Sequence, residues 1–341
     1  MKTYKDFAYA LQCFFEEYLA KECGASNNTI RSYRDTFVLF LDFMHKKHKT
    51  NPDNIKFEMI DKILILEFLE WIQNTRNCCT NTRNQRYASI RSFFNYMLYI
   101  DPVHLLQWKN ICSIRIKTQE KDTCKYLTVD GIKHLIEQIN VKTIRGRRDL
   151  TIISLLYYSG ARVQELIDLT PFSLRKIKPF YVEFLGKGSK KRNVPIEETM
   201  MKLLESYMNE HNLNQPGMEH RPLFFNAWGS KLTNPGITYI LRKYAMEANK
   251  MNPELVPKEI SPHVLRHSRA MHLLQSGVNL VYIRDILGHV SIQTTEIYAR
   301  ADSKLKRIAL EKAYEDIGIK EPKIKSWERD PKIKLYLQGL C

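Results

Sequence analysis

A polar and basic stretch interrupts the apolar periodicity of this 341-residue chain between Lys109 and Lys125. Before it, apolar residues recur at helical spacing. After it, a helical pattern returns at Thr128 and gives way once to alternation. Each side is long enough to bury its own core, so the break predicts two domains joined by a basic linker. We place the boundaries as follows: domains at 1–108 and 126–310, a linker at 109–125 and a tail at 311–341.

The first domain is predicted to be helical. Its apolar residues form four stripes that begin at Phe7, Tyr33, Ile65 and Ile90, and Pro102 closes the unit. The fourth helix opens with a polar and basic turn, whose chemistry-bearing side chains are Asn81, Thr82, Arg83 and Arg86. Two interpretations of this turn stay open: a solvated helix start, or a DNA-binding helix end that contacts phosphates or a groove.

The second domain is predicted to be helical with one β-hairpin. The hairpin comprises Phe180–Phe184 and Arg192–Ile196 around a turn at Gly186–Ser189. Helices are predicted at 129–140, 147–158, 162–169, 197–210, 234–249, 262–275, 279–287 and 291–298. The whole chain is therefore expected to be mainly α with a small β-sheet, an α+β fold.

The charge of the chain points to a polyanionic partner. Lys and Arg number 53 against 37 Asp and Glu, a net charge of +16, which favours nucleic acid or an anionic membrane without choosing between them. No apolar run approaches the ~18 residues of a membrane span, and acidic residues soon after Lys2 argue against a signal peptide. Seven scattered cysteines without a Cys-x-x-Cys pair support neither a disulfide framework nor a zinc ribbon, so we expect the reducing cytosol.

The first candidate site segment is Gly160–Glu165. Arg162 directly follows the predicted helix stop, so its neighbours hold it in place. Glu165, one turn later, either holds the Arg162 guanidinium or serves as an acid in the first turn of a helix. Buried Arg–Glu pairs often have structural roles, so this pattern alone does not define a site.

The second segment is His263–His267, at the start of a predicted helix. His263 and Arg266 share one helix face, near backbone N–H groups that favour an anion. His263 and His267 also have the i, i+4 spacing of zinc ligands. However, Val264 stands where a zinc protease has Glu and no further ligand motif follows, so we expect no metal.

The third segment is Leu287-Gly288-His289, followed by Tyr298 on the next short helix. Taken singly, His289 is typical of a cap and Tyr298 of core packing. With the other segments and the hairpin-turn Lys187, they supply the charges and hydrogen bonds needed to hold and attack a phosphodiester. Forming a phenolate from a tyrosine of pKa ~10 costs about 4 kcal/mol at pH 7, which nearby cations lower. The chain has no carboxylate cluster or phosphate-binding glycine loop, so we expect a mechanism without metal, ATP or other cofactor.

In this order and spacing, the motifs resemble those of the tyrosine recombinase family, the phage integrases and bacterial site-specific recombinases. The resemblance covers about residues 1–310, because the first domain, with Thr29–Tyr33 in its second helix, is similar to the family's helical core-binding domain. It implies that the second domain is catalytic and recombines DNA through a 3′-phosphotyrosine intermediate and a Holliday junction. The implied roles are as follows: Tyr298 as nucleophile, Arg162 and Arg266 as phosphate clamp, Lys187 as general acid, His263 as proton acceptor or phosphate donor, and His289 as phosphate donor. Glu165 and His267 are kept as structural.

The resemblance also implies a setting. The expected partners are double-stranded DNA and either three further copies or related recombinases in a mixed tetramer, with no membrane, in a bacterial cytoplasm. Integration, excision or transposition of a mobile element is the preferred role. The alternatives are a chromosome- or plasmid-dimer-resolving recombinase, a DNA-relaxing topoisomerase of the same chemistry, and a DNA-binding regulator without catalysis. The tail ends in apolar residues that either dock on a neighbouring protomer or pack in cis: Ile333, Leu335, Leu337 and Leu340.

Overall fold

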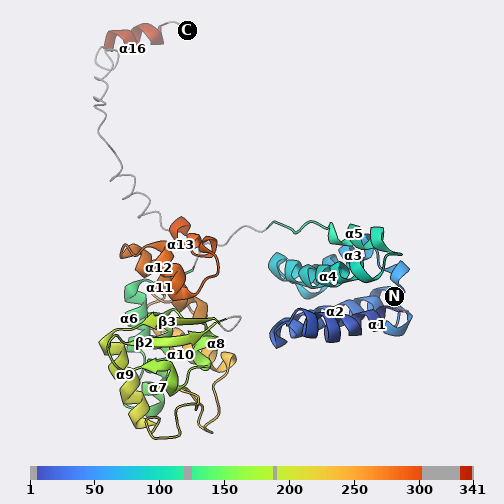
Figure 1. Cartoon of the computed structure of the whole chain (residues 1–341). Coiled ribbons are helices and arrows are strands. Elements are labelled where there is room, and N and C mark those ends of the chain that lie inside the picture. The colour runs from blue at the N-terminus through green and yellow to red at the C-terminus, as the bar shows by residue number, and fades with distance from the viewer. Residues whose placement is uncertain (1–5, 119–124, 187–189, 302–330, 340–341) are drawn as a thin grey trace. The chain divides into compact units, whose positions relative to one another are not determined.

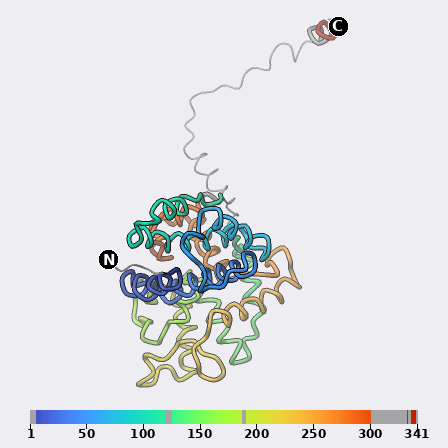
Figure 2. Tube along the Cα trace, turned by 90° about the vertical axis from the view of Figure 1, so that its right-hand side faces the viewer, coloured from blue at the N-terminus to red at the C-terminus, as the bar shows by residue number. Residues whose placement is uncertain are grey.

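The computed structural model describes residues 6–118, 125–186, 190–301 and 331–339. The chain divides into two compact units, Met1–Asp122 and Thr123–Cys341, and each has its own hydrophobic core (Figure 1). The Cα tube of Figure 2 follows the chain through the first unit from blue to green and through the second from green to orange. The hairpin-turn Lys187 and residues 302–330 of the tail lie outside the described residues.

The first unit is helical, as expected. Its principal helices are α1 (Phe7–Cys13), which continues into a π-helix (Phe14–Glu22), α2 (Asn27–His48), α3 (Lys62–Arg76), α4 (Thr80–Ile100) and α5 (Leu105–Cys112). Asp6, Ser26 and Asp61 cap α1, α2 and α3 by accepting hydrogen bonds from backbone N–H groups within the first turn. The apolar stripes then meet in a core rich in aromatic rings.

The first domain extends beyond its predicted end at residue 108. The basic linker was expected to begin at Lys109, but α5 continues to Cys112, and both Ile111 and Ile114 are buried in the core of the first unit. The reason is that the isoleucines continue the apolar face that Trp108 begins, although the residues between them are polar. The helical spacing of apolar residues therefore continues as far as Ile114.

The second unit consists of helices around a small antiparallel sheet. Its principal elements are α6 (Val129–Glu137), α7 (Ile144–Ser159), α8 (Val163–Ile167), β1 (Leu174–Arg175), β2 (Tyr181–Leu185), β3 (Lys191–Pro195), α9 (Glu198–Glu210), α10 (Asn234–Met251), α11 (Pro262–Gln275), α12 (Leu280–Leu287) and α13 (Glu296–Ala301). The strand order is β1-β2-β3, and Val182 faces Val194 across the hairpin. The expected fold class, mainly α with a small sheet, is confirmed, although β1 was not predicted. A single helix was expected at 291–298, whereas the structure has a 3₁₀ turn (Ile292–Thr294) before α13.

The helices α11, α12 and α13 gather at one end of the second unit (Figure 1), and α11 contacts α7, α12 and α13. Gly160 ends α7 in the left-handed conformation, with φ of 58°. A Cβ at this position would lie 2.7 Å from Cδ2 of Leu287, so any other residue at position 160 would displace the Leu287 side chain as well as strain the backbone. This junction brings the candidate site segments together.

A small cluster of buried residues lies beside the main core at this end of the unit. It comprises Ala270, Met271, Leu274, Ile283, Leu287 and Tyr298. A further helix, α16 (Pro331–Gln338), carries exposed Leu335 and Leu337 of the apolar tail end. Among the described residues, no helix is long and apolar enough to cross a membrane.

Candidate functional site

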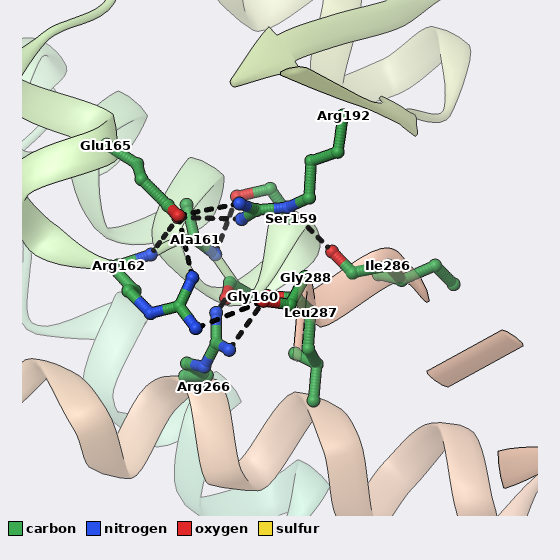
Figure 3. A network of polar contacts seen from close by, with 10 residues as sticks. All are labelled: Ser159, Gly160, Ala161, Arg162, Glu165, Arg192, Arg266, Ile286, Leu287 and Gly288. Atoms are coloured by element: carbon green, nitrogen blue, oxygen red, sulfur yellow. Dashed lines mark hydrogen bonds and ion pairs between the residues drawn. The ribbon is translucent and has the colours of Figure 1, made fainter. Parts of the chain in front are cut away.

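Arg162 is held at the N-terminus of α8 by Glu165. Its backbone N–H donates to Oε2 of Glu165 at 2.8 Å, and its Nη1 donates to Oε1 at 2.8 Å. Its Nη2 reaches the carbonyl of Gly288 at 3.2 Å (Figure 3). The Arg162 side chain is 38% exposed, whereas that of Glu165 is 5% exposed. The buried carboxylate thus presents a partly open guanidinium at the surface, suited to an anion.

Arg266, on α11, is buried and joins two helix ends. Its Nη1 donates to the carbonyl of Gly160 at 2.7 Å and its Nη2 to that of Leu287 at 2.8 Å. The last carbonyls of a helix have no partner within the helix and carry its negative dipole end, so a cation is favoured there. Burial and the nearby Arg162 lower the pKa of Arg266 to about 10, which still leaves it charged at pH 7.

Arg192, on β3, extends the same network. Its Nη1 and Nη2 donate to the two carboxylate oxygens of Glu165 at 2.6 and 2.7 Å, and its Nε donates to the carbonyl of Ile286 at 3.0 Å (Figure 3). Burial alone would raise the pKa of Glu165, but the hydrogen bonds and charge of Arg192, with those of Arg162, hold it below its usual value. Glu165 is therefore ionised throughout the neutral range.

Tyr298, on α13, lies between two histidines. Its hydroxyl is 2.9 Å from Nδ1 of His267, and its ring stacks on that of His289 with centroids 6.5 Å apart. Nδ1 of His289 is in turn 2.9 Å from the hydroxyl of Thr295. The Tyr298 residue is only 1% exposed. His267, which was expected to be structural, thus contacts the expected nucleophile directly.

The histidines of this cluster favour the neutral form. Burial, then the charges of Arg266 and Arg162, lower the pKa of His289 to about 4. Desolvation lowers the pKa of His263 and of His267 as well, and the charge of Arg266 adds to both effects. Neutral imidazoles can each accept one proton, which is the state that a proton acceptor needs.

The structure brings together five of the six expected catalytic residues: Arg162, His263, Arg266, His289 and Tyr298. The sixth, Lys187, lies outside the described residues. Arg192 was missed by the sequence reasoning, although a signal existed. Arg192 shares the inward face of its strand with Val194, whose side chain is buried, and an arginine on a buried strand face needs a partner. Within the described part of the chain, no group of His, Cys, Asp and Glu is placed to hold a metal ion.

The basic turn in the first unit is placed at the start of α4, and its residues differ in exposure. Asn81 is exposed and Thr82 half-buried. Arg83 is 3% exposed and donates to the side chain of Asn84. Arg86 donates to the backbone carbonyl of Ser32 and to the hydroxyl of Thr36, both on α2. The two arginines therefore contribute to the packing of the unit, and Asn81 and Thr82 remain available at its surface.

Comparison with known proteins finds two family models and several relatives that match this chain. The family model described as "Phage integrase family" matches residues 125–304, and that described as "Phage integrase, N-terminal SAM-like domain" matches residues 14–99. The putative integrase/recombinase y4rC of Sinorhizobium fredii is 33% identical over 92% of this chain and 93% of its own length. The tyrosine recombinase XerD of Oceanobacillus iheyensis is 34% identical over 85% of this chain and 93% of its own.

The fold also matches that of solved structures. The crystal structure of the XerH site-specific recombinase bound to palindromic difH substrate, a post-cleavage complex, superposes with a TM-score of 0.66. The match covers 89% of this chain and 85% of that one, at 21% identity. Both units therefore have counterparts of known fold.

Proposed function

This chain belongs to the phage integrase family of tyrosine recombinases, and we propose that it cleaves and rejoins double-stranded DNA at specific sites with Tyr298 as the nucleophile. One observation carries the assignment of the site. Arg266 and His267 are successive residues of α11: the first joins the helix ends that also hold Arg162, and the second bonds the hydroxyl of Tyr298. One buried cation of the site and the hydrogen-bond partner of the proposed nucleophile are thus neighbours on α11.

The two arginines suit a phosphodiester. A guanidinium offers paired N–H donors to non-bridging oxygens and stays charged in a partly buried site. The partly exposed guanidinium of Arg162 can donate to the phosphate, and the buried guanidinium of Arg266 adds positive charge close by. The first unit contributes DNA contacts through the start of α4, where Asn81 is exposed and Thr82 and Arg86 are half-buried.

The cleavage step follows from these contacts. The Tyr298 oxygen attacks the phosphorus, the bond from phosphorus to the 5′ oxygen breaks, and a 3′-phosphotyrosine forms. The phenolic proton passes to a neutral histidine, and His267 is the one hydrogen-bonded to the hydroxyl. His263 and His289 donate to the phosphate oxygens. By family resemblance Lys187, outside the described residues, protonates the leaving 5′ oxygen. A 5′-hydroxyl then reverses the step on a partner strand.

We propose that neither metal nor ATP takes part. The phosphotyrosine bond retains the energy of the phosphodiester, so rejoining needs no external source. Positive side chains neutralise the charge that develops on the phosphate. The exchange of strands between two DNA sites is proposed to occur in a tetramer, either of this chain alone or with related recombinases.

A nicked suicide substrate tests the function. The wild-type protein should form a covalent protein–DNA adduct in the presence of a chelator and without ATP, and Tyr298→Phe should form none. Tyr282→Phe is the matched control, because Tyr282 is exposed on α12 and should leave the adduct unchanged. An adduct that persists in Tyr298→Phe would overturn the assignment of the nucleophile.

The biological role is proposed to be integration, excision or transposition of a mobile element, in line with the likeness to an integrase/recombinase. Dimer resolution, the alternative that the sequence left open, is the second candidate. Footprints of the protein on DNA flanking its gene separate the two. Protected inverted repeats at element ends support the first role, and a single chromosomal site elsewhere supports the second.

A further inference from the structure

Three successive carbonyls at the end of α12 each accept a hydrogen bond from a different arginine. Arg192 takes the carbonyl of Ile286, Arg266 that of Leu287 and Arg162 that of Gly288. His289 follows directly in the chain (Figure 3 shows the three contacts). Since these carbonyls lack partners within the helix, the arginines fix the helix end that presents His289.

Arg192 differs from the other two arginines in its surroundings. Its side chain is 11% exposed, and its guanidinium lies 5.0 Å from the ring centroid of Phe184. All three of its nitrogens donate to protein oxygens. Arg162, by contrast, is 38% exposed. Arg192 is thus engaged by the protein itself and has no open edge for a phosphate.

Glu165 connects Arg192 to Arg162. Its carboxylate accepts four hydrogen bonds, two from each arginine, which fills the capacity of a carboxylate. If Arg192 were removed, two of these acceptor sites would be empty in a buried place, and the carboxylate would turn to satisfy them. The orientation of Arg162 depends on this carboxylate, so it depends on Arg192 as well.

The backbone is shaped to admit Arg192. Gly288 has φ of 65°, and a Cβ at this position would lie 2.9 Å from Cδ and 3.1 Å from Nη1 of Arg192. Glycine therefore serves two purposes at position 288: it allows the left-handed end of α12, and it leaves room for the arginine stem. The close approach indicates that the position of Arg192 is specified and not incidental.

We propose that Arg192 is a positioning residue for strand cleavage, which orients Arg162 through Glu165 and His289 through the end of α12 without itself touching the DNA. The proposal rests on the proposed function. It adds a third arginine to the two of the clamp and gives that arginine a different role. Arg162 meets the phosphate, the buried Arg266 adds its charge close by, and Arg192 keeps Arg162 and His289 in position.

Single-turnover cleavage of the suicide substrate is the primary test. Arg192→Met keeps the length of the stem but removes every hydrogen bond, and Arg192→Lys keeps the charge but cannot reach Glu165 and Ile286 together. Both should slow adduct formation by about 100-fold, the effect of a small misplacement of reacting groups, while DNA affinity in a gel-shift assay stays near wild type. Lys191→Met is the matched control. Lys191 is the neighbouring cation on β3, its side chain is 65% exposed, and its substitution should change neither quantity.

A second substrate separates positioning from general structural damage. A methylphosphonate at the scissile position replaces one charged oxygen by methyl, so the orientation of Arg162 should matter less. Most of the cleavage defect of the Arg192 variants should then disappear. A defect of equal size on both substrates contradicts positioning of the clamp. If Arg192→Met does not fold, as judged by thermal unfolding, Arg192→Lys carries the comparison.

The outcomes distinguish this inference from the proposed function. If the wild-type chain forms no adduct, the proposed function fails. If the wild-type chain cleaves and both Arg192 variants cleave at the same rate, the positioning role fails alone. If the Arg192 variants lose DNA affinity in parallel with cleavage, Arg192 is a DNA contact and the positioning role is likewise wrong.

Discussion

The two halves of the candidate site are built differently. The clamp half, defined as Arg162, Glu165, Arg192 and Arg266, is held by hydrogen bonds to a buried carboxylate and to the carbonyls that end α7 and α12. The nucleophile half, defined as His267, His289 and Tyr298, contains aromatic rings in contact with one another and a hydrogen bond between His267 and the Tyr298 hydroxyl. Tyr298 itself belongs to a small apolar cluster beside the main core.

This difference follows from what each half must do. Charge on a phosphate is best met by groups that need no reorganisation when the reaction occurs, and multiple bonds to the fold supply that rigidity. The nucleophile, in contrast, must reach the phosphorus, and Tyr298 is 1% exposed. The proposed attack therefore requires that the Tyr298 hydroxyl becomes accessible to the phosphate.

The largest effect is expected from the clamp half. Arg266→Lys keeps the charge, but an ammonium cannot bridge the carbonyls of Gly160 and Leu287 as a guanidinium does. We expect single-turnover adduct formation to fall about 10³-fold, as for the loss of a preorganised electrostatic group, and the melting temperature to fall as well. A Lys variant that cleaves at the wild-type rate would show that the clamp needs charge alone, and the contrast between the halves would disappear.

Most of the helices and the residue set of the site could be predicted from the sequence because they depend on local patterns. The helix α11 (Pro262–Gln275) was expected at the same residues, since Pro262 and the apolar stripe mark it. Arg162, Arg266 and Tyr298 were identified through motif order and spacing. The contact between Arg162 and Glu165 was one of two interpretations of the sequence, because the two residues are one turn apart. Contacts between segments could not be predicted, because they join residues far apart in the chain, as Arg266 and Gly160 are.

The missed features share one physical cause. The local patterns around Arg192 and His267 do not reveal their partners, and the importance of both residues arises from what the fold places next to them. The same holds in the first unit, where Arg83 and Arg86 resemble a basic surface turn in sequence although Arg83 is buried and Arg86 bonds α2. A charged residue in a sequence therefore indicates an exposed position only if the fold places no buried polar partner beside it.

A smaller effect is expected from the nucleophile half. His267→Leu removes the hydrogen bond to the Tyr298 hydroxyl, and adduct formation should fall about 10²-fold, the lower range for loss of a proton-transfer group. His267→Asn places an amide near the position of Nδ1 and should recover part of the rate. Single-turnover cleavage of the suicide substrate measures both. If His267→Leu cleaves as fast as wild type, His267 does not take the phenolic proton, and His263 becomes the candidate acceptor.

The smallest effect is expected on the free energy of unfolding. As pH falls, the two halves lose their contributions to it in different pH ranges. The pKa of His289 is lowered to about 4 in the folded chain, so the unfolded chain binds its proton first as pH falls below the usual value near 6.5. Stability is therefore full above about pH 6.5 and declines toward pH 4, as the linkage relation requires. The lowered pKa of Glu165 acts at lower pH: its contribution is present above its usual value and is lost as pH falls through the folded value.

Urea unfolding of the full chain between pH 8 and 4 measures this separation as a difference between variants. His289→Gln removes one titrating imidazole, so its free energy of unfolding should fall less steeply than that of wild type between about pH 6.5 and 4. Half-buried His211 and buried His272, elsewhere in the second unit, have lowered pKa values and act in the same direction, but they are present in both proteins and cancel. Equal slopes in the two proteins would mean that His289 is not held neutral by its surroundings. The folded chain would then accommodate a protonated His289 ring beside Arg162 and Arg266. In that case the nucleophile half would accept positive charge as readily as the clamp half does.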